Sequence, residues 1–462
     1  MKKFGLLLLV AVFVVSMVGF GIGCKTTTST TAAETTAAET TAAAETTKAE
    51  ETTTTAAAGE KVQVTIFGWL TSYAKPFSEK FAELVAKKYP NIELVFQEST
   101  YEETGTQYLL KAQSGDVPDI AYCELIMANE LGNVGALEDL SQFLDPKVIS
   151  DLPESVYNAC LFDGKLVSIM WDISPYALFT SSSLATKAGF TKAPRTIDEF
   201  KKMALAIGKL GKDDKGNKIW GTNLAGMESE VHIPYLFAPW LYNMGGNFFD
   251  QTTGKATINS KEAVAAVQMF KDLYDAGVFG PVPVARDVNR QVFVQGDVGM
   301  IGEGPWQRGL FRDLSGLGEA YDKEWWLDTY PTLDGSPGKS LMWSSNAAIM
   351  KGAKHPEEAA KVIEMWVSDP EVVLAYGELN GGIPAVKSIQ NLPEVQNDPY
   401  RKVFVDEINA GGNLPFAPHA TKITELSGMF SKAFLDILLN NAPVQATLDK
   451  LNADMDAAVA AK

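Results

Sequence analysis

The order of apolar and polar residues predicts that the folded part of the chain opens with a strand, a helix and a second strand. Lys61–Phe67 alternates at its centre and ends apolar, which is typical of a strand. Pro76–Lys88 has its apolar residues spaced as one face of a helix. Ile92–Phe96 is again a strand by the same criteria. This strand–helix–strand order predicts a parallel sheet.

The same alternation of short apolar runs and amphipathic segments continues along the chain. Tyr108–Gln113 is amphipathic, and Ile120–Cys123 is predicted as the next strand. His355–Val367 and Ile423–Leu439 are predicted as amphipathic helices. Strands that alternate with half-polar helices over such a length predict two α/β lobes.

Helix boundaries are marked by specific residues. Thr196 is followed three residues later by Glu199 and then by an apolar helical face, which is the pattern of a capping box. Asn259 or Ser260 is expected to cap the next helix. Gly277 is expected to end that helix.

Phe293–Trp306 reads FVQGDVGMIGEGPW and combines a short apolar strand with a turn. Val298–Ile301 is bounded by glycine and predicts a buried strand, and the letters GEGP then break regular structure. Trp306 follows the carboxyl end of the strand, where open α/β sheets bind ligands. Trp306 is therefore either a surface on which a ligand lies or a core residue after a turn, and the local pattern alone favours the core.

The N-terminus has the pattern of an export signal. Lys2 and Lys3 precede the apolar run Leu6–Val18, which is of signal-peptide length and short for a transmembrane helix. Gly21, Ile22 and Gly23 precede Cys24, and small residues before such a cysteine resemble the lipobox of bacterial lipoproteins. In that family leucine is usual where Gly21 stands. Residues 1–23 are expected to be a signal peptide, and the resemblance implies that Cys24 becomes the lipidated N-terminus.

Residues 24–59 are expected to form a disordered tether. The segment consists almost entirely of Thr, Ala and Glu and repeats TTAAE at Thr30–Glu34 and Thr35–Glu39. It has no aromatic residue and no apolar period, so it cannot bury enough surface to offset its conformational entropy. We expect this tether to hold the folded body away from a membrane.

Bulk composition narrows the possible partners. The chain has 462 residues, too many for one core once the N-terminal segments are removed, so two domains are expected. The formal charge of −17 disfavours nucleic acid, because phosphate contacts need a basic surface. With 3 His and 3 Cys, a His- or Cys-rich metal site is not expected. No cofactor is expected either.

Nine segments, taken in order, resemble motifs of the extracellular solute-binding proteins of bacterial ABC importers, in the family that includes maltose- and oligosaccharide-binding proteins. The segments are KKYPNIELVF, SGDVPDIAY, DGKLVSIMWD, KAGFTKAPRTIDEFKKMA, NMGGNFFD, NSKEAVAAVQMFKDLYDAGVF, FVQGDVGMIGEGPW, KHPEEAAKVIEMWVSDPEV and GGIPAVKS. Ile169 and Ile197 stand where the family usually has aromatic residues. Each motif alone is weak, whereas nine in the right order identify the chain as resembling this family.

The resemblance implies an α/β fold with two lobes, each a mostly parallel sheet flanked by helices, and a ligand cleft between them. It implies lobes that are discontinuous in sequence, with crossings near Trp171–Ser174, Ser340–Trp343 and Gly381–Ala385. The expected boundaries are residues 60–172 plus 341–384 for the first lobe and 173–340 plus 385–462 for the second.

A sugar would be bound by two kinds of side chain. The apolar face of a pyranose packs on an aromatic ring, and its hydroxyls suit carboxylates and amides in a dry cleft. Aromatic and acidic residues follow predicted strands or lie at predicted crossings. The expected ligand-binding residues are Trp69, Tyr73, Glu124, Trp171, Asp172, Tyr235, Trp306 and Trp343.

The other aromatic and sulfur-bearing residues are expected to be structural. His232, Trp240, Phe416 and His419 are interpreted as packing or surface residues, and Trp220, Trp325, Trp326 and Trp366 as structural ones. Cys123 and Cys160 are expected to be buried free thiols, although export makes a disulfide chemically possible.

The family resemblance implies a mechanism and leaves alternatives. Two lobes would close by a hinge around the solute, and an ABC permease would recognise the closed form. No catalytic residue is expected, because no local motif places a nucleophile beside a base. The chain is expected to be monomeric, with its body in the periplasm or at the extracellular face. The alternatives are the same fold binding a peptide, a polyamine or another non-sugar solute, and a secreted carbohydrate-active enzyme that uses Glu124 with Asp172.

Overall fold

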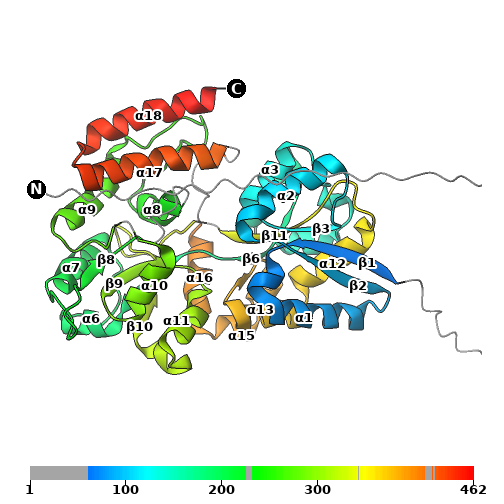
Figure 1. The fold of residues 1–462 in the computed structure, drawn as a ribbon, viewed down its shortest axis with the longest axis horizontal. Helices are drawn as coiled ribbons and strands as arrows, with labels where there is room; N and C mark the ends of the chain where they lie inside the picture. The colour runs from blue at the N-terminus through cyan, green and yellow to red at the C-terminus, as the bar shows by residue number, and fades with distance from the viewer. Residues whose placement is uncertain are drawn as a thin grey trace, which may run out of the picture. The chain divides into compact units, whose positions relative to one another are not determined.

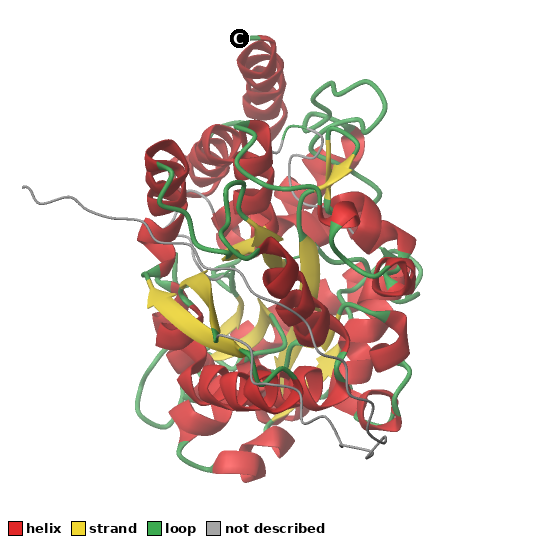
Figure 2. Cartoon of the chain, turned by 90° about the vertical axis from the view of Figure 1, so that its right-hand side faces the viewer, coloured by secondary structure: helices red, strands yellow, loops and turns green. Residues whose placement is uncertain are grey.

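The computed structural model describes residues 61–224, 232–282, 284–341, 343–411, 419 and 422–461. Within these ranges the chain builds a six-stranded and a four-stranded sheet, each covered by helices, and a small two-stranded sheet of β4 (Leu161–Phe162) and β5 (Lys165–Leu166). Figure 2 shows the strands enclosed by helices.

The six-stranded sheet begins with the predicted strand–helix–strand unit. Its strand order is β12 (Ile383–Pro384), β6 (Ile169–Ile173), β11 (Ser344–Ile349), β3 (Ile120–Glu124), β1 (Val62–Gly68) and β2 (Ile92–Glu98). β1 pairs in parallel with β2 and β3, whereas β11 runs antiparallel to both β3 and β6. β11 is therefore inserted between two strands, β3 and β6, that come much earlier in the sequence.

Helices cover both faces of this sheet. Helices α1 (Leu70–Lys88), α12 (Pro356–Ser368) and α13 (Pro370–Asn380) lie on one face, and α2 (Tyr101–Ser114) and α3 (Leu125–Asn133) lie on the other (Figure 1). The buried faces of α1 and α12 carry Phe81 and Trp366, whose rings contact at 5.0 Å between centroids. Short helices complete this part: η1 (Leu140–Gln142), α4 (Pro146–Asp151) and α5 (Glu154–Ala159).

The four-stranded sheet has the order β10 (Trp325–Asp328), β7 (Ala177–Ser181), β9 (Val298–Glu303) and β8 (Trp220–Thr222). β8 and β9 are parallel, and β7 is antiparallel to β9 and β10. All six residues of β9 are buried, as the apolar run within FVQGDVGMIGEGPW predicts.

Helices from three separate stretches of sequence surround the four-stranded sheet. The first stretch gives α6 (Ser182–Lys187), α7 (Ile197–Gly208), α8 (His232–Asn243), α9 (Lys261–Asp275), α10 (Arg286–Val294), α11 (Gln307–Ser315) and η2 (Gly318–Lys323). The later stretches give α16 (Pro399–Ala410), α17 (Ile423–Asn440) and α18 (Val444–Ala460). Between the two sheets, α14 (Lys387–Gln390) contacts β12 of the six-stranded sheet, and α15 (Pro393–Gln396) joins α14 to α16. α17 and α18 lie side by side in Figure 1 and pack against α8 and α9.

The predicted elements and caps are confirmed where the structure describes them. The side chain of Thr196 accepts a hydrogen bond from the backbone of Glu199, and the carboxylate of Glu199 accepts one from the backbone of Thr196, which completes the capping box. Ser260, rather than Asn259, caps α9.

One expectation of sheet geometry needs correction, because both sheets are mixed and most neighbouring strand pairs named above are antiparallel. β7 and β11 are the first strands built after the chain passes from one sheet to the other. Such a strand enters its sheet from the edge at which parallel strands end, so it runs against them.

The chain passes between the sheets at two places along these strands. It leaves the six-stranded sheet after Ile173 and enters the four-stranded sheet at Ala177. It leaves the four-stranded sheet after Asp328 and returns at Ser344. The exact lobe boundaries given above remain a prediction.

Several predictions fall on residues that are not described. The signal peptide, Cys24, the tether and Phe416 lie outside the described residues, as does the side chain of Tyr73. Within the described ranges, no helix has both the length and the apolar character that crossing a membrane requires.

Candidate functional site

Side chains gather at one edge of the six-stranded sheet because its strands end there together. Glu124 is the last residue of β3, and Trp69 directly follows β1. Asp172 lies one residue from the end of β6, opposite Ser345 of the antiparallel β11. The carboxyl ends of parallel strands form the edge at which α/β sheets bind ligands. Two carboxylates, a hydroxyl and an indole are thereby brought to one edge.

Aromatic and basic side chains from the four-stranded sheet face the same space. Trp306 follows β9 and immediately precedes α11. Arg286 and Arg290 lie one turn apart on α10, which packs on β9. Ser174 and Tyr176 belong to the segment that joins the two sheets, and Trp343 directly precedes β11.

These residues line one cavity of about 330 Å³, here called the central cavity. Its walls are formed by Trp69, Tyr122, Glu124, Asp172, Ser174, Tyr176, Arg286, Arg290, Trp306, Leu310, Trp343, Ser345 and Tyr376. Clefts that bind small molecules have volumes of about 300–1,000 Å³, with mostly apolar walls and a few converging polar groups. The central cavity has both the volume and the composition of such a site.

The ring of Trp306 rests on the backbone of Gly304. A Cβ placed on Gly304 would lie 2.2 Å from both Cη2 and Cζ3 of Trp306 and 2.7 Å from Cε3. Distances this short to three ring atoms place the glycine against the flat face of the indole, since an approach at the edge would leave Cε3 much farther away. Gly304 therefore leaves the space in which the ring of Trp306 packs against the backbone. Trp306 is half-buried, so part of its ring remains available in the central cavity.

Asp172 is a buried carboxyl in the cavity wall. It is 4% exposed, and its Oδ1 accepts a hydrogen bond of 2.8 Å from the hydroxyl of Ser174. Burial raises the pKa of Asp172 to about 6, because the charged form loses hydration, although hydrogen bonds to Ser174, Tyr376 and Ser345 partly oppose the shift. The side chain can thus both accept and, when protonated, donate a hydrogen bond near neutral pH.

Two arginines of the central cavity share one buried carboxylate. Glu303 is fully buried, and its Oε2 accepts a hydrogen bond of 2.9 Å from Nη2 of Arg286, while its Oε1 accepts one of 2.9 Å from Nε of Arg290. Burial alone would raise the pKa of Glu303, but the charges and hydrogen bonds of both arginines outweigh it and lower the pKa to about 2. The cluster is therefore ionised at physiological pH.

Tyr235 lies behind the cavity wall, contrary to its expected place on the surface of the site. It is fully buried on α8, and its ring meets that of Trp343 edge to face, with centroids 5.1 Å apart. Its helical position turns it into the core of the four-stranded sheet. Tyr235 supports Trp343, and only Trp343 reaches the central cavity.

Trp171 was also expected in the site, and the structure places it in the core instead. It is 1% exposed and packs against Tyr376 and Trp366, with ring centroids 4.2 and 4.9 Å away. Successive residues of a strand point to opposite faces, so Trp171 and its neighbour Asp172 cannot both face the cavity. Of the other predicted residues, the central cavity brings together Trp69, Glu124, Asp172, Trp306 and Trp343.

Several cavity residues were not anticipated from the sequence. Tyr122 and Ser345 come from strands whose pairing is long-range, and Tyr376 comes from α13, so no local pattern marks them. The sequence does contain a signal for Arg286 and Arg290. Their spacing puts them on one face of a helix, and the buried strand that follows ends in Glu303, a carboxylate. A carboxylate at the end of an apolar strand needs a cationic partner.

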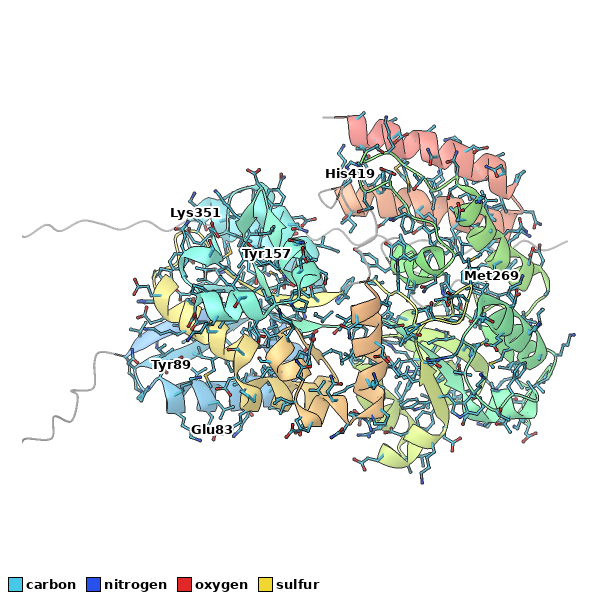
Figure 3. The ribbon with its side chains drawn as sticks, turned by 180° about the vertical axis from the view of Figure 1, so that it is seen from behind. Glu83, Tyr89, Tyr157, Met269, Lys351 and His419 are labelled. Atoms are coloured by element: carbon cyan, nitrogen blue, oxygen red, sulfur yellow. The ribbon has the colours of Figure 1, made fainter. Side chains whose placement is uncertain are left out.

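Residues that were expected to be structural lie apart from the central cavity. His419, labelled in Figure 3, packs its ring against Phe249, and its Nε2 lies 2.8 Å from the carbonyl oxygen of Gly254. Trp240 is buried against Phe200. Cys123 and Cys160 are both buried and unbridged, as predicted.

Comparison with known families decides the assignment. Residues 72–403, more than half of the chain, match the model of a family described as bacterial extracellular solute-binding protein. The chain belongs to this family. Membership makes the chain an exported solute-binding protein and agrees with the resemblance seen in the nine motifs.

Individual relatives and solved structures agree with the family. The maltotriose-binding protein of Pyrococcus abyssi is 22% identical over 384 residues, which cover 80% of this solute-binding protein and 77% of that relative. The GacH receptor of Streptomyces glaucescens, solved unliganded and with acarbose, superposes with a TM-score of 0.73 at 20% identity, covering 86% of this chain and 98% of that one. An ABC transporter solute-binding protein of Thermotoga lettingae, solved with α-D-tagatose, gives a TM-score of 0.72 at 18% identity, covering 87% and 100%. The structural matches confirm the two-lobed α/β fold.

Proposed function

We propose that this protein captures a sugar or oligosaccharide in the central cavity and delivers it to an ABC permease by closure of its two lobes. The observation that carries the proposal is the joint presence of exposed indole surface and buried carboxylates around one cavity. Trp306 and Trp343 are half-buried, Glu124 and Asp172 are buried, and all four border the same cavity. That combination matches the apolar face and the hydroxyl rim of a pyranose.

The two sides of the central cavity offer complementary hydrogen-bonding groups. Glu124 and Asp172, from the six-stranded sheet, accept hydrogen bonds when ionised. Arg286 and Arg290, from α10, can only donate. A sugar hydroxyl both donates and accepts, so a neutral polyol can satisfy both sides at once.

The same distribution bears on the non-sugar alternatives. The ammonium groups of a polyamine would find partners in Glu124 and Asp172, but they would share the cavity with Arg286 and Arg290, and like charges repel where the dielectric is reduced. A peptide remains compatible with these charges. The relatives named above bind maltotriose, acarbose and tagatose according to their descriptions, which further favours a saccharide.

A thermal-shift screen tests the proposal directly. The purified protein is melted with tagatose, maltose, maltotriose, a tripeptide and spermidine, each at millimolar concentration. A ligand that binds the native state selectively raises the melting temperature. We expect at least one saccharide to do so, and no effect from spermidine. A shift with spermidine or the tripeptide but with no saccharide would overturn the sugar assignment.

The alternative of a carbohydrate-active enzyme can be tested through Asp172. Its pKa, raised to about 6 by burial, is in the range that glycosidases use for a general acid. We expect the protein to bind saccharides without turning them over. Prolonged incubation with maltotriose followed by chromatography checks this, and steady release of glucose or maltose would identify an enzyme.

We further propose that Cys24 carries a lipid anchor and that the segment after it tethers the body to the membrane. The small residues before Cys24 and the Thr/Ala/Glu composition of residues 25–59 support this. Metabolic labelling with palmitate should mark the wild-type protein, and Cys24→Ser should abolish the label and release the protein from the membrane fraction. A membrane-bound, labelled Cys24→Ser variant would contradict the assignment.

A further inference from the structure

Glu303 occupies a position that the proposed recognition of a sugar does not explain. It is the last residue of β9, it is fully buried, and it is absent from the wall of the central cavity. Each of its two oxygens accepts hydrogen bonds from both Arg286 and Arg290, over four distances of 2.9–3.4 Å. A charged side chain outside the cavity wall thus stands in a strand whose six residues are all buried.

These hydrogen bonds fix the orientation of Arg286. Because Glu303 fixes its Nε and Nη2 together, the guanidinium plane of Arg286 is oriented rather than free to rotate. Nη2 also donates a hydrogen bond of 3.3 Å to the hydroxyl of Tyr176. In this orientation the guanidinium carbon lies 5.2 Å from the ring centroid of Trp306, within the range of a cation–π contact.

Trp306 is therefore held from several directions. The backbone of Gly304 lies against one face of the ring, Tyr176 meets the ring edge to face at 5.6 Å, and the guanidinium of Arg286 lies over the ring. Among the described residues, these contacts come from the end of β9, the inter-sheet segment and α10. Each of these contacts is made by the protein itself, so none requires a bound ligand.

We propose that Glu303 and Arg286 are positioning residues that hold Trp306 in the orientation in which it receives the ligand. This inference rests on the proposed function, because it assumes that Trp306 contacts the solute. Glu303 orients the guanidinium of Arg286 by hydrogen bonds, and that guanidinium contacts the ring of Trp306. The buried carboxylate therefore affects binding although it is not in the cavity wall. The lowered pKa of Glu303 keeps the arrangement charged throughout the physiological range.

The first test needs no ligand. The chain has 9 Trp, so protein labelled with 5-fluorotryptophan gives one fluorine resonance for each, and Trp306→Phe identifies that of Trp306. Arg286→Lys keeps the charge but cannot form the two-pronged, planar contact. We expect Arg286→Lys and Glu303→Gln to shift the Trp306 resonance.

Arg312→Lys is the matched control. Arg312 lies on α11, and its guanidinium grips Asp322 with two hydrogen bonds of 2.9 and 2.6 Å outside the central cavity. We expect this variant to leave the Trp306 resonance where it is. Should Glu303→Gln fail to fold, Arg286→Lys alone decides. A resonance that Arg286→Lys leaves unmoved would overturn the proposal.

The second test is a double-mutant cycle with maltotriose as the probe. Arg286→Lys should weaken maltotriose binding by about tenfold when Trp306 is present, and by only about two- to threefold in a Trp306→Ala background, where just the hydrogen bonds that Arg286 itself gives to the sugar are left to lose. Equal losses in both backgrounds would show that Arg286 acts by direct contact and not through the indole. If the wild type binds no saccharide, the proposed function fails, while the fluorine measurement still decides whether Glu303 and Arg286 hold the ring.

Discussion

Replacing Trp306 by alanine should weaken saccharide binding, whereas replacing a tryptophan of the core should lower stability alone. A tryptophan side chain has about 150–250 Å² of surface, and no more than about a third of that of Trp306 is exposed, which leaves at most roughly 50–80 Å² for a ligand to cover. At about 25 cal/mol per Å², covering this area contributes about 1–2 kcal/mol. The dissociation constant should therefore rise about 5- to 30-fold in Trp306→Ala. Isothermal titration calorimetry with the saccharide found in the thermal-shift screen measures the change.

The stability arm of this prediction uses a tryptophan outside the cavity as its control. Trp325 is 8% exposed and packs against Phe179 and Tyr400, with ring centroids 5.2 and 5.8 Å away. Trp325→Ala should lower the free energy of unfolding by about 3–5 kcal/mol and leave affinity nearly unchanged. Trp306→Ala should lower it by roughly half as much, since only part of its ring is buried. Urea denaturation gives both values. The reasoning is refuted if Trp306→Ala unfolds as readily as Trp325→Ala while its affinity stays that of the wild type.

Two further predictions concern the support and charge of the site, and a third concerns a buried carboxyl outside it. Gly304→Ala should weaken saccharide binding about tenfold or more, because its Cβ would lie 2.2 Å from two ring atoms of Trp306; Gly105→Ala, with open space around it, should change neither affinity nor fold. Saccharide affinity should rise between pH 5 and 7 as Asp172 ionises through its pKa of about 6, and Asp172→Asn should flatten that profile in calorimetry. Burial raises the pKa of Glu407 well above its ordinary value, so the folded state keeps a proton that the unfolded state loses above about pH 4.3, and stability falls as pH rises. Glu407→Gln should therefore gain stability relative to the wild type between pH 5 and 8 in thermal melts, and a difference that stays constant would contradict this.

The sequence predicted the local elements well because their signals are local. Period-2 and period-3.6 patterns located β1, α1 and β2, and the capping box of Thr196 and Glu199 located the start of α7. The order of the strands in a sheet could not be predicted from such local patterns. β11 lies between β3 and β6 although more than 170 residues separate it from either in sequence, and no periodicity specifies that partner choice.

The candidate site was predictable where a residue stands directly at a strand end. Trp69 and Glu124 satisfy that condition, Trp306 comes three residues after the end of β9, and all three line the central cavity. Trp171 failed because the position of a strand end says nothing about which face a side chain takes, and alternation assigns opposite faces to Trp171 and Asp172. The prediction for Tyr235 was wrong because only one face of a helix can face the cavity, and the sequence did not identify that face.

The stretch GEGPW shows why the site and the core cannot be separated at Trp306. Gly302 has no room for a side chain, because a Cβ there would lie 1.9 Å from the hydroxyl oxygen of Tyr330, and Gly304 has none because of the indole. Between them, both oxygens of Glu303 accept hydrogen bonds from the arginines. Two bare backbone positions therefore flank a charged anchor. Trp306 packs on Gly304 and is held through Arg286 by Glu303, so a residue can belong partly to the core and still present an ordered ring to a solute.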